Sequence, residues 1–151
     1  HNVAHSFPTR RSSDLIGELE RRKPRVLVVD DDRFFRAVLE DALTAAGMEV
    51  ETAADGQEAL SRLAEMLFEV DAVVLDLNMP GLDGYCLIDR IRRLGGEADL
   101  VLVVLASSSE IELEKLRGSH AANDAIRKGT PLEEIVRRVR RLVSAAPPAG
   151  E

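Results

Sequence analysis

The chain has 151 residues, of which 45% are hydrophobic, so it is long enough for one compact domain and too short for two ordinary ones. Its formal net charge of -7 argues against a nucleic-acid-binding surface, and no uncharged apolar run approaches the roughly 20 residues that a membrane span requires. The single cysteine, Cys86, excludes an internal disulfide and fits a reducing compartment, so we expect a soluble, cytoplasmic protein with Cys86 half-buried on a helix.

The two ends of the chain do not belong to the predicted domain. Residues 1–15 resemble an in-frame translation of a DNA-sequencing adapter, and we exclude them from the fold as a non-native segment. We interpret residues 16–24 as an upstream tail or the end of a helix. Residues 145–151, with two prolines and a glycine, are typical of a linker or a disordered tail. The domain is therefore predicted over residues 25–144, and the native termini are left open.

The first half of this domain alternates strands and helices. Residues 25–30 form an apolar run that ends in an acid and predict a buried strand. Apolar side chains at helical spacing, Phe35 among them, predict a helix over residues 33–46. A weaker strand is predicted over residues 48–53. Residues 55–58 have the acid-x-x-Glu spacing of a capping box, which predicts that a second helix starts there.

The second half continues the alternation. Residues 71–76 predict a third strand, and Asp83 is placed to cap a helix with Leu87, Ile88, Ile91 and Leu94 on its apolar face. Residues 99–105 are apolar on both faces, as expected for a central strand of a parallel sheet. A poorly periodic helix is expected over residues 109–118.

One more strand and helix complete the pattern. A short strand is predicted over residues 124–127, and the last helix has Thr130 as its cap, Pro131 at its first position and Glu133 in a capping box. Five strands in alternation with five helices predict an α/β fold. We expect a doubly wound, five-stranded parallel sheet of order 2-1-3-4-5 between two helical layers, a flavodoxin-like three-layer sandwich.

Acidic residues stand where two of the predicted strands end. Asp30 and Asp31 end the first strand, and Asp76 ends the third. The order 2-1-3-4-5 makes these strands neighbours, so their carboxylates surface at the same edge of the sheet. Crowded carboxylates repel one another unless a cation lies between them, and an open site made of oxygen ligands suits Mg²⁺. The sequence therefore predicts a magnesium site at this edge.

The segments that contain these acids resemble those of a known protein family. The segments 28–31 and 75–84, together with Lys128, are similar to the receiver domain of two-component response regulators, and the resemblance covers about residues 25–144. It implies phosphorelay signal transduction, in which Asp76 accepts a phosphoryl group from a histidine kinase or a histidine phosphotransfer protein. Such a domain is not an enzyme for external substrates, although it can remove its own phosphoryl group.

The resemblance also implies roles for the neighbouring residues. Asp31, Asp76 and the backbone carbonyl of Asn78 would hold Mg²⁺, and Asp30 would support the ion through water. Lys128 would pair with Asp76 and later with a phosphoryl oxygen. The loop after the third strand would be shaped by Pro80, Gly81 and Gly84.

Three positions depart from the family pattern. Ala106 stands where a Thr or Ser usually ends the fourth strand, although Ser107 or Ser108 would replace it if the strand end shifted. Ala125 stands where the family commonly has an aromatic switch residue. Gly129 replaces the proline of a cis Lys–Pro bond, and without proline a cis bond costs roughly 2.5–4 kcal/mol. All three changes affect the expected readout and leave the acceptor acids in place.

Two other classes stay open. A pseudo-receiver would keep the fold as a docking module without phosphorylation; Ala106, Ala125 and Gly129 favour it, and the complete set of acids disfavours it. A metal-dependent phosphatase would need a second acid where Asn78 stands, and a nuclease would need an upstream catalytic glutamate that we do not find. Asp30 to Asp32 could also be a solvated turn in which Asp32 caps the first helix. The cognate kinase, the output domain or partner protein, and the oligomeric state are left open.

Overall fold

The computed structural model describes residues 22–66, 69–79, 83–95, 100–107, 109–118 and 122–145. Within these ranges, five parallel strands form one sheet of order β2-β1-β3-β4-β5, as predicted. The strands are β1 (Arg25–Val29), β2 (Glu49–Ala53), β3 (Ala72–Asp76), β4 (Val101–Ala106) and β5 (Asp124–Arg127). The helices are α2 (Arg33–Ala45), α3 (Gly56–Glu65), α4 (Gly84–Gly95), α5 (Glu110–Gly118) and α6 (Leu132–Ala145).

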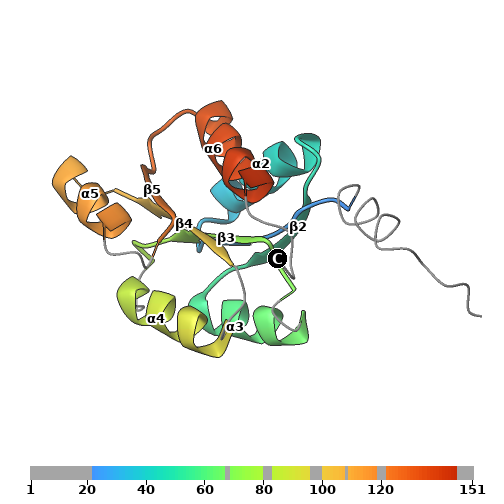
Figure 1. The fold of residues 1–151 in the computed structure, drawn as a ribbon, viewed down its shortest axis with the longest axis horizontal. Helices are drawn as coiled ribbons and strands as arrows, with labels where there is room; N and C mark the ends of the chain where they lie inside the picture. The colour runs from blue at the N-terminus through green and yellow to red at the C-terminus, as the bar shows by residue number, and fades with distance from the viewer. Residues whose placement is uncertain are drawn as a thin grey trace, which may run out of the picture.

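Helices cover both faces of the sheet (Figure 1). The side chains of α3, α4 and α5 pack on one face in a cluster that includes Leu63, Ile91 and Leu113. Those of α2 and α6 pack on the other face, where Leu39 and Ile135 are fully buried. The central strands β3 and β4 are buried along their whole length, which explains why their sequences are apolar without alternation.

The register of the sheet positions the acids. β1 pairs with β3 so that Val29 lies beside Leu75, the residue that precedes Asp76. Asp30 follows Val29 directly, and its backbone N–H donates to the carbonyl of Ala53 at 3.1 Å. Both acids therefore leave the sheet at the same edge, as expected from the strand order.

The predicted acidic caps are confirmed at three helices. Asp32 accepts hydrogen bonds from the N–H groups of Phe34 and Phe35 at the start of α2. Asp55 accepts from the N–H of Glu58 at 2.8 Å, and Glu58 accepts in return from the N–H of Ala54. At α4, the side chain of Asp83 accepts from the N–H of Tyr85, with a longer bond from Cys86. A carboxylate at this position satisfies N–H groups that have no partner within the helix.

Several local predictions were wrong. Cys86 is exposed rather than half-buried, and Leu94 is 58% exposed, because α4 turns both away from the sheet. The last helix begins at Leu132 and not at Pro131, the predicted first position. The carbonyl of Pro131 accepts backbone hydrogen bonds from Glu134 and Ile135. Some predicted features lie outside the described residues, namely segment 1–15, most of segment 16–24, the tail after residue 145, Pro80, Gly81 and Ser108.

No helix in the described part of the chain is both long enough and apolar enough to span a membrane.

Candidate functional site

Two carboxylates that are far apart in the sequence meet at the carboxyl edge of the sheet. Asp76 is the last residue of β3 and Asp30 follows β1, and both side chains are only 2% exposed. Asp31 is exposed. One carboxylate oxygen of each of these three residues lies within 4.8 Å of the others. The structure thus brings together the three acids that the sequence predicted for this edge.

Lys128 enters the acid cluster from the turn after β5. Its Nζ lies 2.7 Å from Oδ2 of Asp76 and 3.2 Å from Oδ2 of Asp30. The same Nζ lies 5.2 Å from the centre of the Phe35 ring, which comes from the first turn of α2. Since the Lys128 side chain is 24% exposed, its ammonium group faces two carboxylates and an aromatic ring more than it faces solvent.

Burial and neighbouring charges shift two pKa values in this site. Burial raises the pKa of Asp30 above its ordinary value of 3.8, and the negative charge of Asp76 raises it further, against opposing contributions from the Asp32 N–H and Lys128. Desolvation alone would lower the pKa of Lys128. The hydrogen bond and charge of Asp76, together with those of Asp30, outweigh desolvation, so the pKa of Lys128 is raised and the ammonium stays charged.

Backbone N–H groups orient the buried carboxylates. Oδ1 of Asp30 accepts from the N–H of Asp32 at 2.8 Å, and Oδ1 of Asp76 accepts from the N–H of Asn78 at 3.0 Å. The Asn78 side chain accepts from the N–H of Ser107 at 2.7 Å and so joins the loops after β3 and β4. Oδ1 of each buried carboxylate is therefore held by a backbone N–H, and Oδ2 lies nearest to Lys128, which also donates to Oδ1 of Asp30 at 3.5 Å.

The donor set fits Mg²⁺. Oδ2 of Asp30 is buried and accepts no hydrogen bond from any described residue, although the Lys128 ammonium is an ion-pair partner 3.2 Å away. A buried carboxylate oxygen without a hydrogen bond is costly. A divalent cation among Asp30, Asp31 and Asp76 would be coordinated by this oxygen and would reduce the repulsion between the acids. Carboxylate oxygens beside an open, exposed side are the ligands and the geometry that Mg²⁺ prefers.

The strand ends next to the acids carry no hydroxyl and no aromatic group. β4 ends at Ala106, which is fully buried, and Ala125 in β5 is fully buried in the same apolar cluster. Ser107 is exposed and is held through its N–H by Asn78. The described residues contain no cis peptide bond, so the bond between Lys128 and Gly129 is trans.

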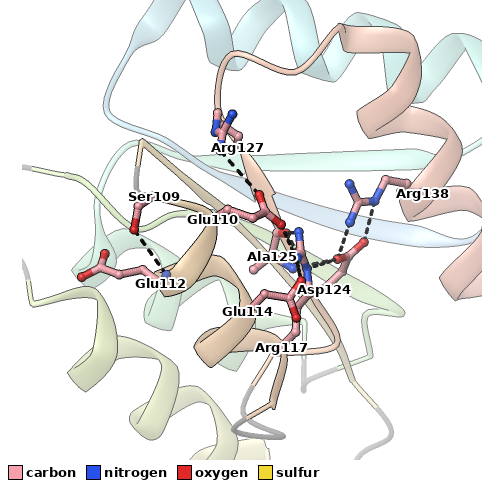
Figure 2. Close-up of polar contacts among 9 residues, drawn as sticks. All are labelled: Ser109, Glu110, Glu112, Glu114, Arg117, Asp124, Ala125, Arg127 and Arg138. Carbon is pink, nitrogen blue, oxygen red and sulfur yellow. Dashed lines mark hydrogen bonds and ion pairs between the residues drawn. The ribbon is translucent and has the colours of Figure 1, made fainter.

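Polar contacts tie β5 to the helices on either side of it (Figure 2). Arg117 of α5 donates from Nε and Nη2 to the carbonyl of Ala125, at 3.1 and 2.6 Å, and from Nη1 to Glu110 at 3.0 Å. Arg138 of α6 donates two hydrogen bonds to Asp124, at 2.8 and 2.6 Å. β5, which Lys128 follows directly, is therefore held by hydrogen bonds from two guanidinium groups.

Two residues of α2 belong to the site although the sequence did not predict it. Helical spacing predicts Phe35 only as an apolar helix residue, yet its ring faces the Lys128 ammonium. Nη1 of Arg36 donates to the backbone carbonyl of Asp30 at 2.7 Å. Their nearness to Asp30 in the sequence was the feature that could have predicted their place in the site. The contact with Lys128 joins distant parts of the chain and is not visible in local sequence.

Comparison with known proteins agrees with this geometry. The family model described as response regulator receiver domain matches residues 26–140. The transcriptional regulatory protein PrrA of Mycobacterium leprae is 42% identical over 121 residues, which cover 80% of this chain and 50% of PrrA. The response regulator MprA of Mycolicibacterium vanbaalenii is 41% identical over 131 residues, which cover 84% of this chain and 54% of MprA. The chain thus spans about half the length of these relatives.

Solved structures show the same fold. A response regulator from Thermotoga maritima superposes with a TM-score of 0.71 at 29% identity, over 82% of this chain and 100% of that chain. The response regulator protein TrrA from the same organism, in complex with Mg²⁺-BeF, has a TM-score of 0.66 at 31% identity, over 79% and 98% of the two chains. With the family model spanning the sheet from β1 to β5, the chain belongs to the response regulator receiver domain family.

Proposed function

We propose that this receiver domain accepts a phosphoryl group on Asp76 with the help of Mg²⁺. The observation that carries the proposal is the position of Lys128, whose Nζ lies 2.7 Å from Oδ2 of Asp76 inside the acid cluster. A carboxylate nucleophile at the end of a rigid strand, with a fixed cation beside it, is suited to attack an electrophilic phosphorus.

The chemistry follows from the charges in the site. An oxygen of Asp76 would form a new O–P bond while the bond from phosphorus to the donor's imidazole nitrogen breaks, and that nitrogen keeps the bonding electrons and takes up a proton. Lys128 would follow the negative charge from the carboxylate to a phosphoryl oxygen. When bound among Asp30, Asp31 and Asp76, with the Asn78 carbonyl as a further ligand, Mg²⁺ would supply positive charge that reduces repulsion between nucleophile and phosphoryl oxygens.

The partners follow from the same role. The phosphoryl donor would be a histidine kinase or a histidine phosphotransfer protein. Because the relatives PrrA and MprA are about twice as long as the matched region, the protein would act through an output domain or a partner protein. The domain itself would not be an enzyme for external substrates, and a cytoplasmic location stays a prediction.

We further propose that the readout of phosphorylation is atypical. Ala106 and Ala125 are both fully buried, and neither side chain can donate a hydrogen bond to a phosphoryl group or swing an aromatic ring inward. In addition, the carbonyl of Ala125 is held from outside by Arg117. A signal would therefore leave the site by another route, such as the loop joined by Asn78 and Ser107.

Incubation with a small phosphodonor and Mg²⁺, followed by intact-mass measurement, tests the acceptor role. We expect wild type to gain the mass of one phosphoryl group and Asp76→Asn to gain none. Asp41→Asn, which changes an exposed acid of α2 outside the cluster, is the matched control and should be modified like wild type. If wild type gains no mass, the acceptor role is wrong and the phosphorylation-independent docking module is favoured.

Amide NMR spectra with and without Mg²⁺ and beryllofluoride test the readout. We expect the large shifts in the loops after β1, β3 and β4 and at Lys128, with small changes within β5 and α5. Large shifts throughout β5 and α5 would show that phosphorylation is still read out through the ends of β4 and β5, despite Ala106 and Ala125.

A further inference from the structure

The ring of Phe35 faces the ammonium of Lys128, which pairs with Asp76 in the acceptor site. Nζ of Lys128 lies 5.2 Å from the ring centre, within the range in which an ammonium is attracted by the π-electrons of an aromatic face. Phe35 is partly buried and packs against the cluster formed by α2, α6 and the sheet. Its neighbour Phe34 is 79% exposed. The two phenylalanines therefore have unlike surroundings at consecutive positions.

The location of the ring is set by the same turn that holds the acids. Asp32 caps α2 by accepting from the N–H of Phe35 at 3.1 Å, and the Asp32 N–H donates to Asp30. Arg36, the next residue, donates to the carbonyl of Asp30. The same turn thus sets the positions of both the ring and the Asp30 carboxylate next to Lys128.

A lysine in this site needs such a constraint. Its ammonium stands on a flexible four-carbon chain, and transfer of a phosphoryl group to Asp76 removes the charge from the carboxylate oxygen that holds it. Asp30 would then compete with the new phosphoryl oxygens for the ammonium, and an ammonium that pairs with Asp30 is drawn away from the incoming group. The attraction of the ring does not depend on the charge of Asp76, so it acts equally before and after transfer.

We propose that Phe35 is a positioning residue that holds Lys128 between Asp76 and the incoming phosphoryl group. This inference rests on the proposed acceptor function. Phe35 touches neither the phosphoryl group nor the nucleophile in this role. It acts by restricting the volume that the Lys128 ammonium samples.

Three variants separate this role from packing. Phe35→Leu keeps an apolar side chain and removes the ring face, Phe35→Tyr keeps the ring, and Phe34→Leu makes the first change at the neighbouring exposed site. The measurement is the rate of phosphoryl gain from a small phosphodonor at saturating Mg²⁺, as a function of donor concentration. Thermal unfolding of each variant reports whether the fold is intact.

We expect Phe35→Leu to lower the saturating rate by about threefold to tenfold, as loss of a partly desolvated cation–π contact implies, with the half-saturating donor concentration unchanged. Phe35→Tyr and Phe34→Leu should stay within about twofold of wild type. An equal loss in Phe34→Leu, or no loss in Phe35→Leu, would overturn the inference while the acceptor role stands. Failure of wild type to gain a phosphoryl group would overturn both.

A spectroscopic measurement tests the contact without phosphorylation. In lysine-¹⁵N-labelled protein, ring currents should shift the Lys128 side-chain signal, which Lys128→Arg identifies by its disappearance. We expect the shift to persist in Phe35→Tyr and to be lost in Phe35→Leu. A signal at the same position in Phe35→Leu would show that the ring does not hold the lysine.

Discussion

Oxygens of the Asp30 and Asp76 carboxylates lie within 4.8 Å of each other, and both side chains are only 2% exposed. This closeness follows from the pairing of β1 with β3. Lys128 contributes a single positive charge to the two acids, and Asp31 adds another negative charge at the exposed side. The site therefore carries net negative charge and is suited to a divalent cation.

Mg²⁺ should therefore stabilise the folded protein. A ligand that binds only the folded state adds about 2.7 kcal/mol at a hundredfold excess over its dissociation constant, so we expect a clear rise in Tm when Mg²⁺ is added. Asp31→Asn should lose most of this rise because it removes the exposed carboxylate ligand. Asp41→Asn should keep it. An unchanged response in Asp31→Asn would place the ion elsewhere.

Gly84→Ala should destabilise the domain. A Cβ at this position would lie 2.9 Å from the backbone carbonyl oxygen of Leu77 and would also overlap Cδ1 of Leu77, and the backbone cannot yield as a surface side chain can. Overpacking of this kind typically costs about 1–3 kcal/mol, measurable by urea unfolding. Gly118→Ala is the matched control, since nothing lies within 4 Å of its added Cβ. Equal stability of the two variants would mean that Leu77 relaxes without cost.

Arg138→Met should destabilise the domain because it leaves a charge with too few partners. Asp124 is 10% exposed and would lose two hydrogen bonds, keeping its own contact with the Ala125 N–H and the nearby guanidinium of Arg117. Since the Arg138 side chain is 22% exposed, solvent reduces the effect, and we expect a loss of about 2 kcal/mol.

Arg137→Met is the control for this change. Its side chain is 72% exposed and pairs with Glu134 at the surface, so no measurable loss of stability is expected. If both variants unfold at the same urea concentration, the bidentate pair adds nothing to stability.

Cys86 should react slowly with alkylating reagents in spite of its exposure. Its thiol donates a hydrogen bond to Asp83, and this bond and the charge of that carboxylate raise the pKa of Cys86 above the ordinary value of 9.0. Only the thiolate reacts, so a raised pKa moves the rate profile to higher pH.

The exchange Asp83→Asn tests this cause. Asparagine still caps a helix, but it removes the negative charge, so the thiolate should form at lower pH and alkylation at mildly alkaline pH should accelerate. Asp89→Asn removes a charge with a smaller effect on the thiol and should accelerate it less. A rate that is the same in wild type and Asp83→Asn would contradict the assigned hydrogen bond.

Local chemistry made most of the fold predictable. Apolar runs, helical spacing and acidic caps act over a few residues, and they placed β3, the start of α2 and the start of α3 within about two residues of their positions. The meeting of Asp30 with Asp76 was also predictable, because strand order in an alternating α/β chain is limited to a few arrangements.

The remaining features were decided by tertiary structure. The exposure of Cys86 and Leu94 depends on how α4 is rotated on the sheet, and the periodicity of a short helix does not define that rotation closely. The hydrogen bonds from Arg117 to the carbonyl of Ala125 depend on how α5 lies beside β5.

The acid cluster and its lysine could thus be inferred from sequence, whereas the surroundings of the lysine could not. Asp30, Asp76 and Lys128 stand at strand ends, where the alternating pattern determines which edge of the sheet each residue reaches. Phe35 reaches Lys128 only because the first turn of α2 and the turn after β5 meet at the carboxyl edge of the sheet. Such a contact depends on the packed positions of a helix and a strand far apart in the chain, and only the folded structure defines those positions.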